Sequence, residues 1–170
     1  MKLAITAAVV AVAGAPLFGA GAAVAEPGPV VASATGAGQV HVGPGGEFLR
    51  TFSVSAREYA DGTDKGQAEV QNRLGPFGPI HIEIDCLKVV GNTAYMSGFV
   101  KNITDPTLGI PEGSKTYFAV QDNGEGAESP PDLLSFVFFT GEQTGPTCEE
   151  ILDTAFVFAV EDGNIQVRNG

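Results

Sequence analysis

Basic residues, histidine, cysteine and tryptophan are all scarce or missing in this chain of 170 residues. Nine Lys and Arg stand against 20 Asp and Glu, which gives a formal net charge of −11 at pH 7. Nucleic acids and anionic membranes are bound through clustered Lys or Arg, so the composition excludes both as expected partners. Cations or basic partners fit better, although acidity also serves to keep exported proteins soluble.

The chain also lacks an apolar run of the ~20 residues that a membrane-spanning helix needs. Its N-terminal run, residues 3 to about 15, follows Lys2 and is broken by Pro16 before the small-residue site Ala23-Val24-Ala25. This arrangement predicts a cleaved secretory signal peptide over residues 1–25. No cysteine follows the site, which disfavours a lipoprotein anchor. We therefore expect a secreted, extracellular or cell-envelope protein with no membrane span in its mature form.

Only two cysteines are present, Cys86 and Cys148. An even number of cysteines in an exported chain is typical of disulfide pairing, so we predict a bond between them. Closing a loop of about 60 residues would stabilise the fold by ~4 kcal/mol in the chain-entropy model. A metal site is disfavoured, because Cys-x-x-Cys spacing is absent and only His41 and His81 could complete the ligand set.

Short runs of alternating or β-branched residues recur along most of the chain, with turn residues between them. The pattern predicts an all-β fold, an antiparallel barrel or sandwich of about eight or nine strands. In the clearest run, alternate residues from Ile80 to Cys86 share one face, so we expect Cys86 to point into the core. Gly91-Asn92 predicts a hairpin to the next run. The other expected strands are residues 40–42, 47–56, 67–74, 93–100, 115–121, 133–139, 155–160 and 164–168.

One domain, residues 40–170, is the expected organisation, since this length suits a single core. Residues 26–39 are rich in Gly, Ala and Pro and predict a flexible leader. Thr147 and Glu150 have capping-box spacing, so a helix of one or two turns is expected there.

Acidic residues and glycines gather in residues 122–126, just after an expected strand. Asp122, Glu125 and Asp132 offer the carboxylate oxygens that calcium prefers, which makes them a candidate metal site and calcium the one candidate cofactor. The same composition is typical of a tight turn, because Asp and Asn before Gly tolerate left-handed geometry. Both interpretations stay open. The similar loop at 61–66 contains Lys65 and is interpreted as a solvated hairpin connection.

Catalytic motifs are missing: the sequence has no Gly-x-Ser-x-Gly elbow, His-Glu-x-x-His or phosphate-binding loop. His81 shares an outward strand face with Glu83, so a contact between them is one possible arrangement. Glu83 with Asp85 could form an acid pair, but a glycosidase needs its two carboxylates on either side of a cleft. No catalytic residue is therefore assigned.

Four short segments are similar to a known group of proteins. They are Phe52-Ser53-Val54-Ser55-Ala56, Asp61-Gly62 with Lys65-Gly66-Gln67, Cys86-Leu87 with Val90-Gly91-Asn92-Thr93-Ala94, and Asp122-Asn123-Gly124-Glu125-Gly126 with Pro130-Pro131-Asp132. In order and spacing they resemble a group of small secreted bacterial domains, common in actinobacteria, most of which have no assigned activity. The resemblance covers over half of the mature chain and implies an all-β secreted domain without an established cofactor.

Three functional classes follow from these observations. We expect a noncatalytic extracellular domain, either a binding module or a structural component of the cell envelope, whose partner is a protein or a small molecule. The Phe-rich strands also suit a β-barrel carrier of a small hydrophobic ligand. The third class is a hydrolase that acts through acidic residues, which requires a carboxylate of raised pKa inside a cleft.

Overall fold

The structure, a computed structural model, describes residues 28–73, 78–126 and 128–170. These residues form ten antiparallel strands in one sheet, together with a short 3-10 turn, η1 (Pro106–Leu108). The predicted all-β class is therefore confirmed. The signal peptide predicted over residues 1–25 lies outside the described residues. Within the described ranges, no helix has the length and apolar character needed to cross a membrane.

Most strands pair with their neighbours in the sequence. The meander consists of β1 (Val30–Val42), β2 (Phe48–Tyr59), β3 (Asp64–Asn72), β4 (Ile80–Val90), β5 (Thr93–Ile103), β6 (Lys115–Gln121) and β7 (Leu133–Ser135). β8 (Phe138–Phe139) also pairs with β6, β9 (Phe156–Ala159) pairs with β7, and β10 (Asp162–Asn169) returns to pair with β1. β10 and β9 end the path without pairing with each other, so the sheet is not closed.

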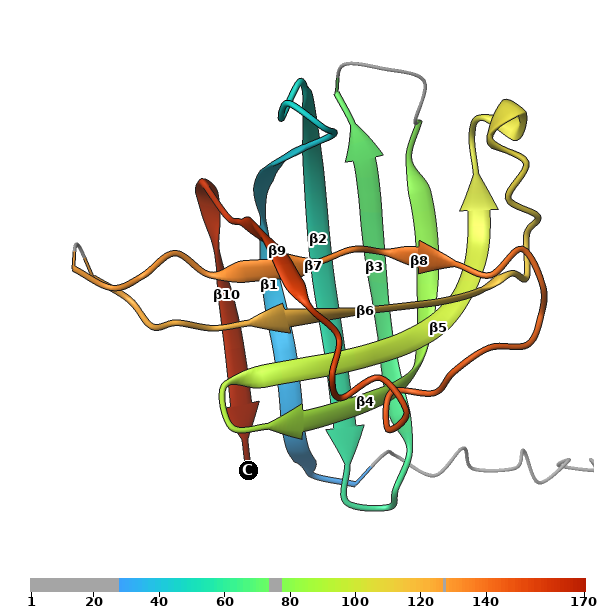
Figure 1. Cartoon of the computed structure of the whole chain (residues 1–170). Helices are drawn as coiled ribbons and strands as arrows, with labels where there is room; N and C mark the ends of the chain where they lie inside the picture. Colours follow the sequence, from blue (N-terminus) through green and yellow to red (C-terminus); the bar gives the residue numbers. More distant parts are fainter. Residues whose placement is uncertain (1–27, 74–77, 127) are drawn as a thin grey trace, which may run out of the picture.

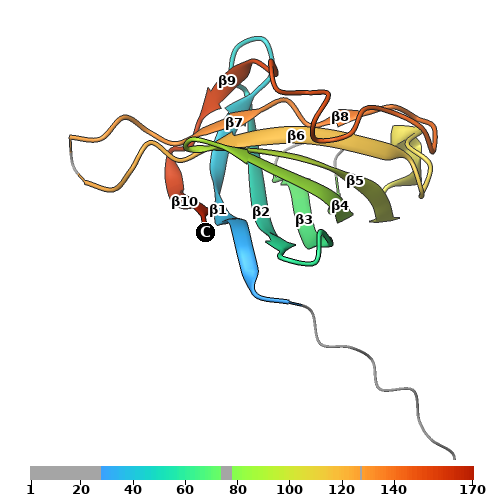
Figure 2. The same ribbon diagram turned by 90° about the horizontal axis from the view of Figure 1, so that it is seen from below.

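The sheet folds into two layers that cross at a steep angle (Figure 1). β10, β1, β2 and β3 form a back layer, and β6, β7 and β8 cross in front of it, as the second view also shows (Figure 2). The long strands β4 and β5 bend from one layer into the other. Between the layers lies the core, whose fully buried side chains include Val40, Ile82, Met96, Val120, Leu134 and Ile165.

Two β-bulges and a glycine accompany the bend of β4 and β5. The register shifts leave Lys101 as the extra residue on β5 and Asp85 as the extra residue on β4. Bulges bend and twist a strand, which is what a strand shared by two layers requires. At the same place, a Cβ on Gly98 would run into the carbonyl oxygen of Glu83, so only glycine fits.

The bulge at Asp85 also reverses the expected orientation of Cys86. Ile84 and Leu87 are both buried, whereas Cys86 between them is only half-buried and lies on the outer face. The prediction that Cys86 points into the core is therefore wrong. One extra residue shifts the alternation of a strand, so every later side chain changes face.

The flexible leader predicted over residues 26–39 is wrong from residue 30 onward. Strand β1 begins at Val30 and lies between β2 and β10, with Ala34 fully buried. Its small residues are needed for that position, because a Cβ on Gly36 would lie 2.5 Å from the carbonyl oxygen of Asn164 on β10. Glycine and alanine here permit close strand contact.

Three further predictions need comment. The two-residue hairpin at Gly91-Asn92 is confirmed, because Val90 pairs with Thr93. The strand predicted over 133–139 is divided into β7 and β8. The helix expected at Thr147 is only a turn: the Thr147 amide donates to Glu150 Oε2 at 2.8 Å, as in a capping box, but the chain does not continue as a helix.

Candidate functional site

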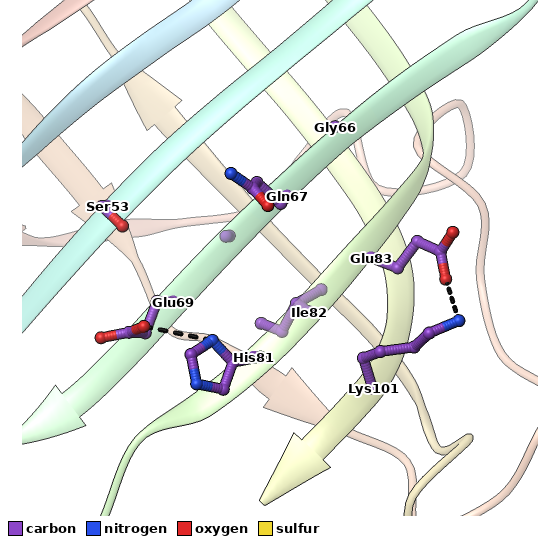
Figure 3. A pocket seen from close by; sticks show the side chains of 9 residues that line it. Ser53, Gly66, Gln67, Glu69, His81, Ile82, Glu83 and Lys101 are labelled. Atoms are coloured by element: carbon purple, nitrogen blue, oxygen red, sulfur yellow. Dashed lines mark hydrogen bonds and ion pairs between the residues drawn. The ribbon is translucent and has the colours of Figure 1, made fainter.

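A pocket of about 560 Å³ lies on the outer face of β2, β3, β4 and β5. Its polar side chains come from all four strands and point away from the core (Figure 3). They are Ser53, Gln67, Glu69, His81, Glu83 and Lys101. We call this pocket the outer groove.

Two pairs of side chains contain all the ionisable groups that line the outer groove. His81 Nδ1 lies 3.1 Å from Glu69 Oε2, and Lys101 Nζ lies 2.6 Å from Glu83 Oε2. The hydrogen bond and the charge of Glu83 raise the pKa of Lys101. His81 therefore pairs across the strands with Glu69, directly opposite it in the register, and Glu83 bonds to Lys101 instead. All four side chains are well exposed, so the pairs are screened by water and add little stability.

The order of residues across the outer groove is unsuited to nucleophilic catalysis. Ser53 pairs with Glu69, and Glu69 pairs with His81. The carboxylate thus lies between the hydroxyl and the imidazole, and two strand spacings separate Ser53 from His81 by roughly 9–10 Å. A catalytic triad needs the base in contact with the nucleophile and the acid behind it. The outer groove offers hydrogen bonds and paired charges, which suit binding.

A second hollow, of about 520 Å³, adjoins the outer groove near the bend of β4 and includes Asp64, Asp85 and Phe99 in its lining. Asp85 accepts hydrogen bonds from Lys115 Nζ at 2.9 and 2.8 Å and from Ser97 Oγ at 3.2 Å. Lys115 is buried and its ammonium also lies 4.4 Å from the centre of the Phe99 ring. The charge of Lys115 is thus neutralised by Asp85 and covered by an aromatic face.

Asp64 lies beside the disulfide in this second hollow. Its Oδ2 accepts the Leu87 amide at 2.9 Å, whereas its Oδ1 is buried and has no hydrogen-bond partner. Burial raises the pKa of Asp64, and repulsion from nearby acids including Asp85 adds to the effect. This environment could not be predicted, because the loop at 61–66 has the composition of a solvated connection.

The disulfide between Cys86 and Cys148 is confirmed. Such a bond is typical of proteins in an oxidising, extracellular compartment. With Asp64, the two sulfurs make the one group of three potential metal-ligating side chains that the described residues contain. Because both sulfurs are used in the disulfide, they are not available as thiolate ligands.

The calcium candidates Asp122, Glu125 and Asp132 each contact β10, but the structure does not bring their carboxylates together into one group of metal-ligating side chains among the described residues. Asp122 accepts the amides of Gly124 at 2.9 Å and Val167 at 3.0 Å. The buried Asp132 accepts the amides of Asn123 at 2.8 Å and Ile165 at 2.7 Å. Glu125 Oε1 accepts from the side-chain amides of Asn164 at 3.4 Å and Gln166 at 3.0 Å. These contacts tie the β6–β7 connection to β10, and a calcium ion, which stays a prediction, would have to compete with them.

No protein-family model matches the chain, and no match was found among the curated proteins or the solved structures. The resemblance to small secreted bacterial domains therefore stays a prediction. Function is inferred below from the geometry of the surface.

Proposed function

We propose that the protein is a noncatalytic exported β-domain whose outer surface binds a partner outside the cytoplasm. The arrangement of the outer groove carries the noncatalytic part of this proposal, and the net charge of −11 favours a basic partner. Its ionisable side chains are exposed and paired in Glu69–His81 and Glu83–Lys101, and its hydroxyl and imidazole are kept apart by a carboxylate. The disulfide supports an extracellular location.

The carrier class receives less support from the interior. A β-barrel carrier holds its ligand inside the fold, where inward side chains leave a cavity. The inward side chains here pack into one continuous cluster between the two layers, and Ile82, Met96 and Leu134 are almost completely buried in it. The pocket of about 560 Å³ lies on the opposite, outer side of the sheet.

Binding is tested with the chain purified after export from a bacterial host. Isothermal titration with poly-L-lysine and with poly-L-glutamate, at low salt and at about 0.15 M salt, measures binding to partners of opposite charge. We expect poly-L-lysine to bind, with an affinity that falls as salt rises, and poly-L-glutamate to give no heat. A chain that binds neither polymer would contradict the preference for basic partners.

The noncatalytic part of the proposal needs a separate assay. Chromogenic esters, glycosides, phosphates and peptides are incubated with the wild-type chain and with His81→Ala. We expect no turnover that differs between the two proteins. Turnover by the wild type that disappears in His81→Ala would show that the outer groove is catalytic.

A hydrolase is the second candidate, and Asp64 is the observation that favours it. A carboxyl whose pKa is raised by burial, with a second carboxyl, Asp85, lining the same hollow, resembles the acid and base pair of many hydrolases. However, Oδ1 of Asp64 is buried and Oδ2 is bonded to the Leu87 amide, so neither oxygen is presented to a substrate. Asp64→Asn in the same substrate panel tests this candidate, which requires a loss of turnover.

A further inference from the structure

The front layer carries a strip of aromatic side chains on its outer face. Tyr117 on β6 and Phe138 on β8 are opposite each other in the register, and their rings stack with centroids 4.9 Å apart. Phe136, in the link between β7 and β8, lies 5.9 Å from Phe138 and meets the ring of Phe158 edge-on at 4.9 Å. We call Tyr117, Phe136 and Phe138 the aromatic strip.

The aromatic strip is exposed to an extent that core packing does not require. Phe136 is 48% exposed and Phe138 is 40% exposed. Leu152 and Val157, which belong to the same C-terminal part of the chain, are 45% and 49% exposed. Contiguous exposed apolar surface on a soluble protein is typical of an interaction site. The rings are also preorganised for binding, because their contacts with one another restrict their side-chain conformations.

The charge of the molecule is concentrated in the same part of the sequence. Residues 116–167 contain no Lys and no Arg, but they contain half of the 20 acidic residues. The cation that precedes this stretch, Lys115, is buried and bonded to Asp85, so its charge is not available to the front layer. Nearly all of the net charge of −11 therefore comes from this stretch.

Residues 140–155 bring several of these acids to the outside of the front layer. The segment leaves β8, passes the bend of β4 and β5 and returns as β9 (Figure 1). The disulfide at Cys148 fixes it to β4, and its exposed acids are Glu142, Glu149, Glu150 and Asp153. Glu149 also lies 3.9 Å from Lys88 Nζ of β4, and both side chains are exposed. Hydrogen bonds from the backbone and side chain of Thr147 lower the pKa of Glu150, which keeps that carboxylate ionised. We call residues 140–155 the acidic segment.

We infer that the aromatic strip and the acidic segment together dock a basic segment of another protein, chiefly through its arginine side chains. This inference rests on the proposed binding function, and it places the partner on the front layer and not in the outer groove. A guanidinium stacks on an aromatic ring and also pairs with carboxylates, and the two features here offer both contacts. Charge complementarity favours a basic protein segment as the partner, since anionic lipids and nucleic acids are repelled by the same carboxylates.

The test uses octa-arginine as the probe and isothermal titration with the exported chain. Phe136→Ser combined with Phe138→Ser removes the rings, and Glu149→Gln combined with Glu150→Gln removes two charges from the acidic segment. Glu47→Gln combined with Glu161→Gln removes two exposed charges outside the outer groove, the aromatic strip and the acidic segment, and is the matched control. Thermal melts establish that each variant is folded. We expect each of the first two variants to weaken octa-arginine binding about tenfold and the control to change it less than about twofold.

Each result has a defined meaning. Equal weakening in the acidic variant and the control would show that binding follows total charge alone, and it would overturn the docking surface. Octa-arginine binding that is unaffected in all the variants, while poly-L-lysine still binds the wild-type chain, would overturn the inference and leave the proposed function intact. Phosphatidylcholine vesicles that bind only when Phe136 and Phe138 are present, with no binding of octa-arginine, would assign the strip to a membrane and also overturn it.

Discussion

Asp64 lies in a position where burial opposes its charge. One carboxylate oxygen is bonded to the Leu87 amide, and the other is buried beside the disulfide without a partner. Burial raises the pKa of Asp64 above its ordinary value of 3.8. In the folded state the group therefore binds its proton more tightly than in the unfolded state, and folding is more favourable when Asp64 is protonated.

Asp64→Asn is accordingly expected to raise the melting temperature at pH 7. The reason is that Asn keeps an oxygen for the Leu87 amide and removes the buried charge. The advantage should shrink as the pH falls through the raised pKa of Asp64 and vanish below its ordinary value of 3.8, where the wild-type carboxyl is protonated in both states. Thermal melts across this range check it, with Glu47→Gln as the control for net charge. A constant difference at every pH would contradict this explanation.

Lys115 is the second residue whose environment predicts a measurable effect. Its side chain is only 7% exposed, and its ammonium is bonded to both oxygens of Asp85. Lys115→Met leaves the Asp85 carboxylate without its partner in a site that is partly closed to water. We expect a loss of about 2 kcal/mol, less than for a fully buried pair because Asp85 remains 39% exposed. Denaturant unfolding measures it.

The exposed pair formed by Lys101 and Glu83 provides the control for that experiment. Lys101 is 69% exposed, so water replaces its partner when the pair is broken. Lys101→Met should therefore leave the unfolding midpoint almost unchanged. Equal losses for the two lysine variants would show that burial does not distinguish the pairs.

At the scale of elements, the bend in β4 and β5 depends on Gly98. A Cβ at this position would collide with the carbonyl oxygen of Glu83. It would also lie 2.9 Å from the Cα of Ile84. Gly98→Ala must push the two strands apart where they pass between layers, and we expect a loss of about 2–4 kcal/mol or a failure to fold. Gly45→Ala is the matched control, because the closest atom to its Cβ would be Glu47 Oε2 at 3.5 Å. Denaturant unfolding compares the stabilities of the two variants. Similar stabilities would contradict the claim that the bend requires glycine at position 98.

Much of the element pattern could be predicted from the sequence, because side-chain alternation has the same period as the strand. The strand at residues 115–121 is found with its predicted bounds, and the Gly91-Asn92 hairpin is confirmed. The leader was mispredicted because Gly and Ala indicate flexibility locally, although in β1 they allow close contact with β10. Cys86 was assigned to the wrong face because a bulge at Asp85 leaves no local signature.

The candidate site was less predictable than the strands for a related reason. The pairing of His81 with Glu69 depends on the register of β3 against β4, and the sequence of either strand alone does not specify that register. The Lys115–Asp85 pair joins residues 30 positions apart and depends on the same bulge that moved Cys86. The aromatic strip likewise needs the pairing of β6 with β8.

At the scale of the whole molecule, the disulfide holds the acidic segment onto the sheet. It joins positions 62 residues apart and connects β4 to a stretch that has no strand between Phe139 and Phe156. Replacing both cysteines by serine should cost about 4 kcal/mol, because the loop constraint on the unfolded chain is lost. Denaturant unfolding measures this loss, and an unchanged midpoint would contradict it.

The distribution of charge is the property that most directly relates the molecule to a partner. Acids without any basic residue fill positions 116–167, whereas the outer groove on β2–β5 contains acids and bases in pairs. The front layer and the outer groove should therefore respond differently to a cationic probe. Attraction of the probe to the front layer should weaken as salt is added, because exposed charges are screened over about 8 Å at physiological ionic strength.

The most direct measurement is amide NMR of the isotope-labelled, exported chain during titration with octa-arginine. We expect chemical-shift changes to be concentrated in β6, β8 and residues 140–155, with little change at Glu69, His81 and Glu83. Changes concentrated in the outer groove, or no change at any residue, would contradict the central claim that the acidic, aromatic face of the front layer is the binding surface.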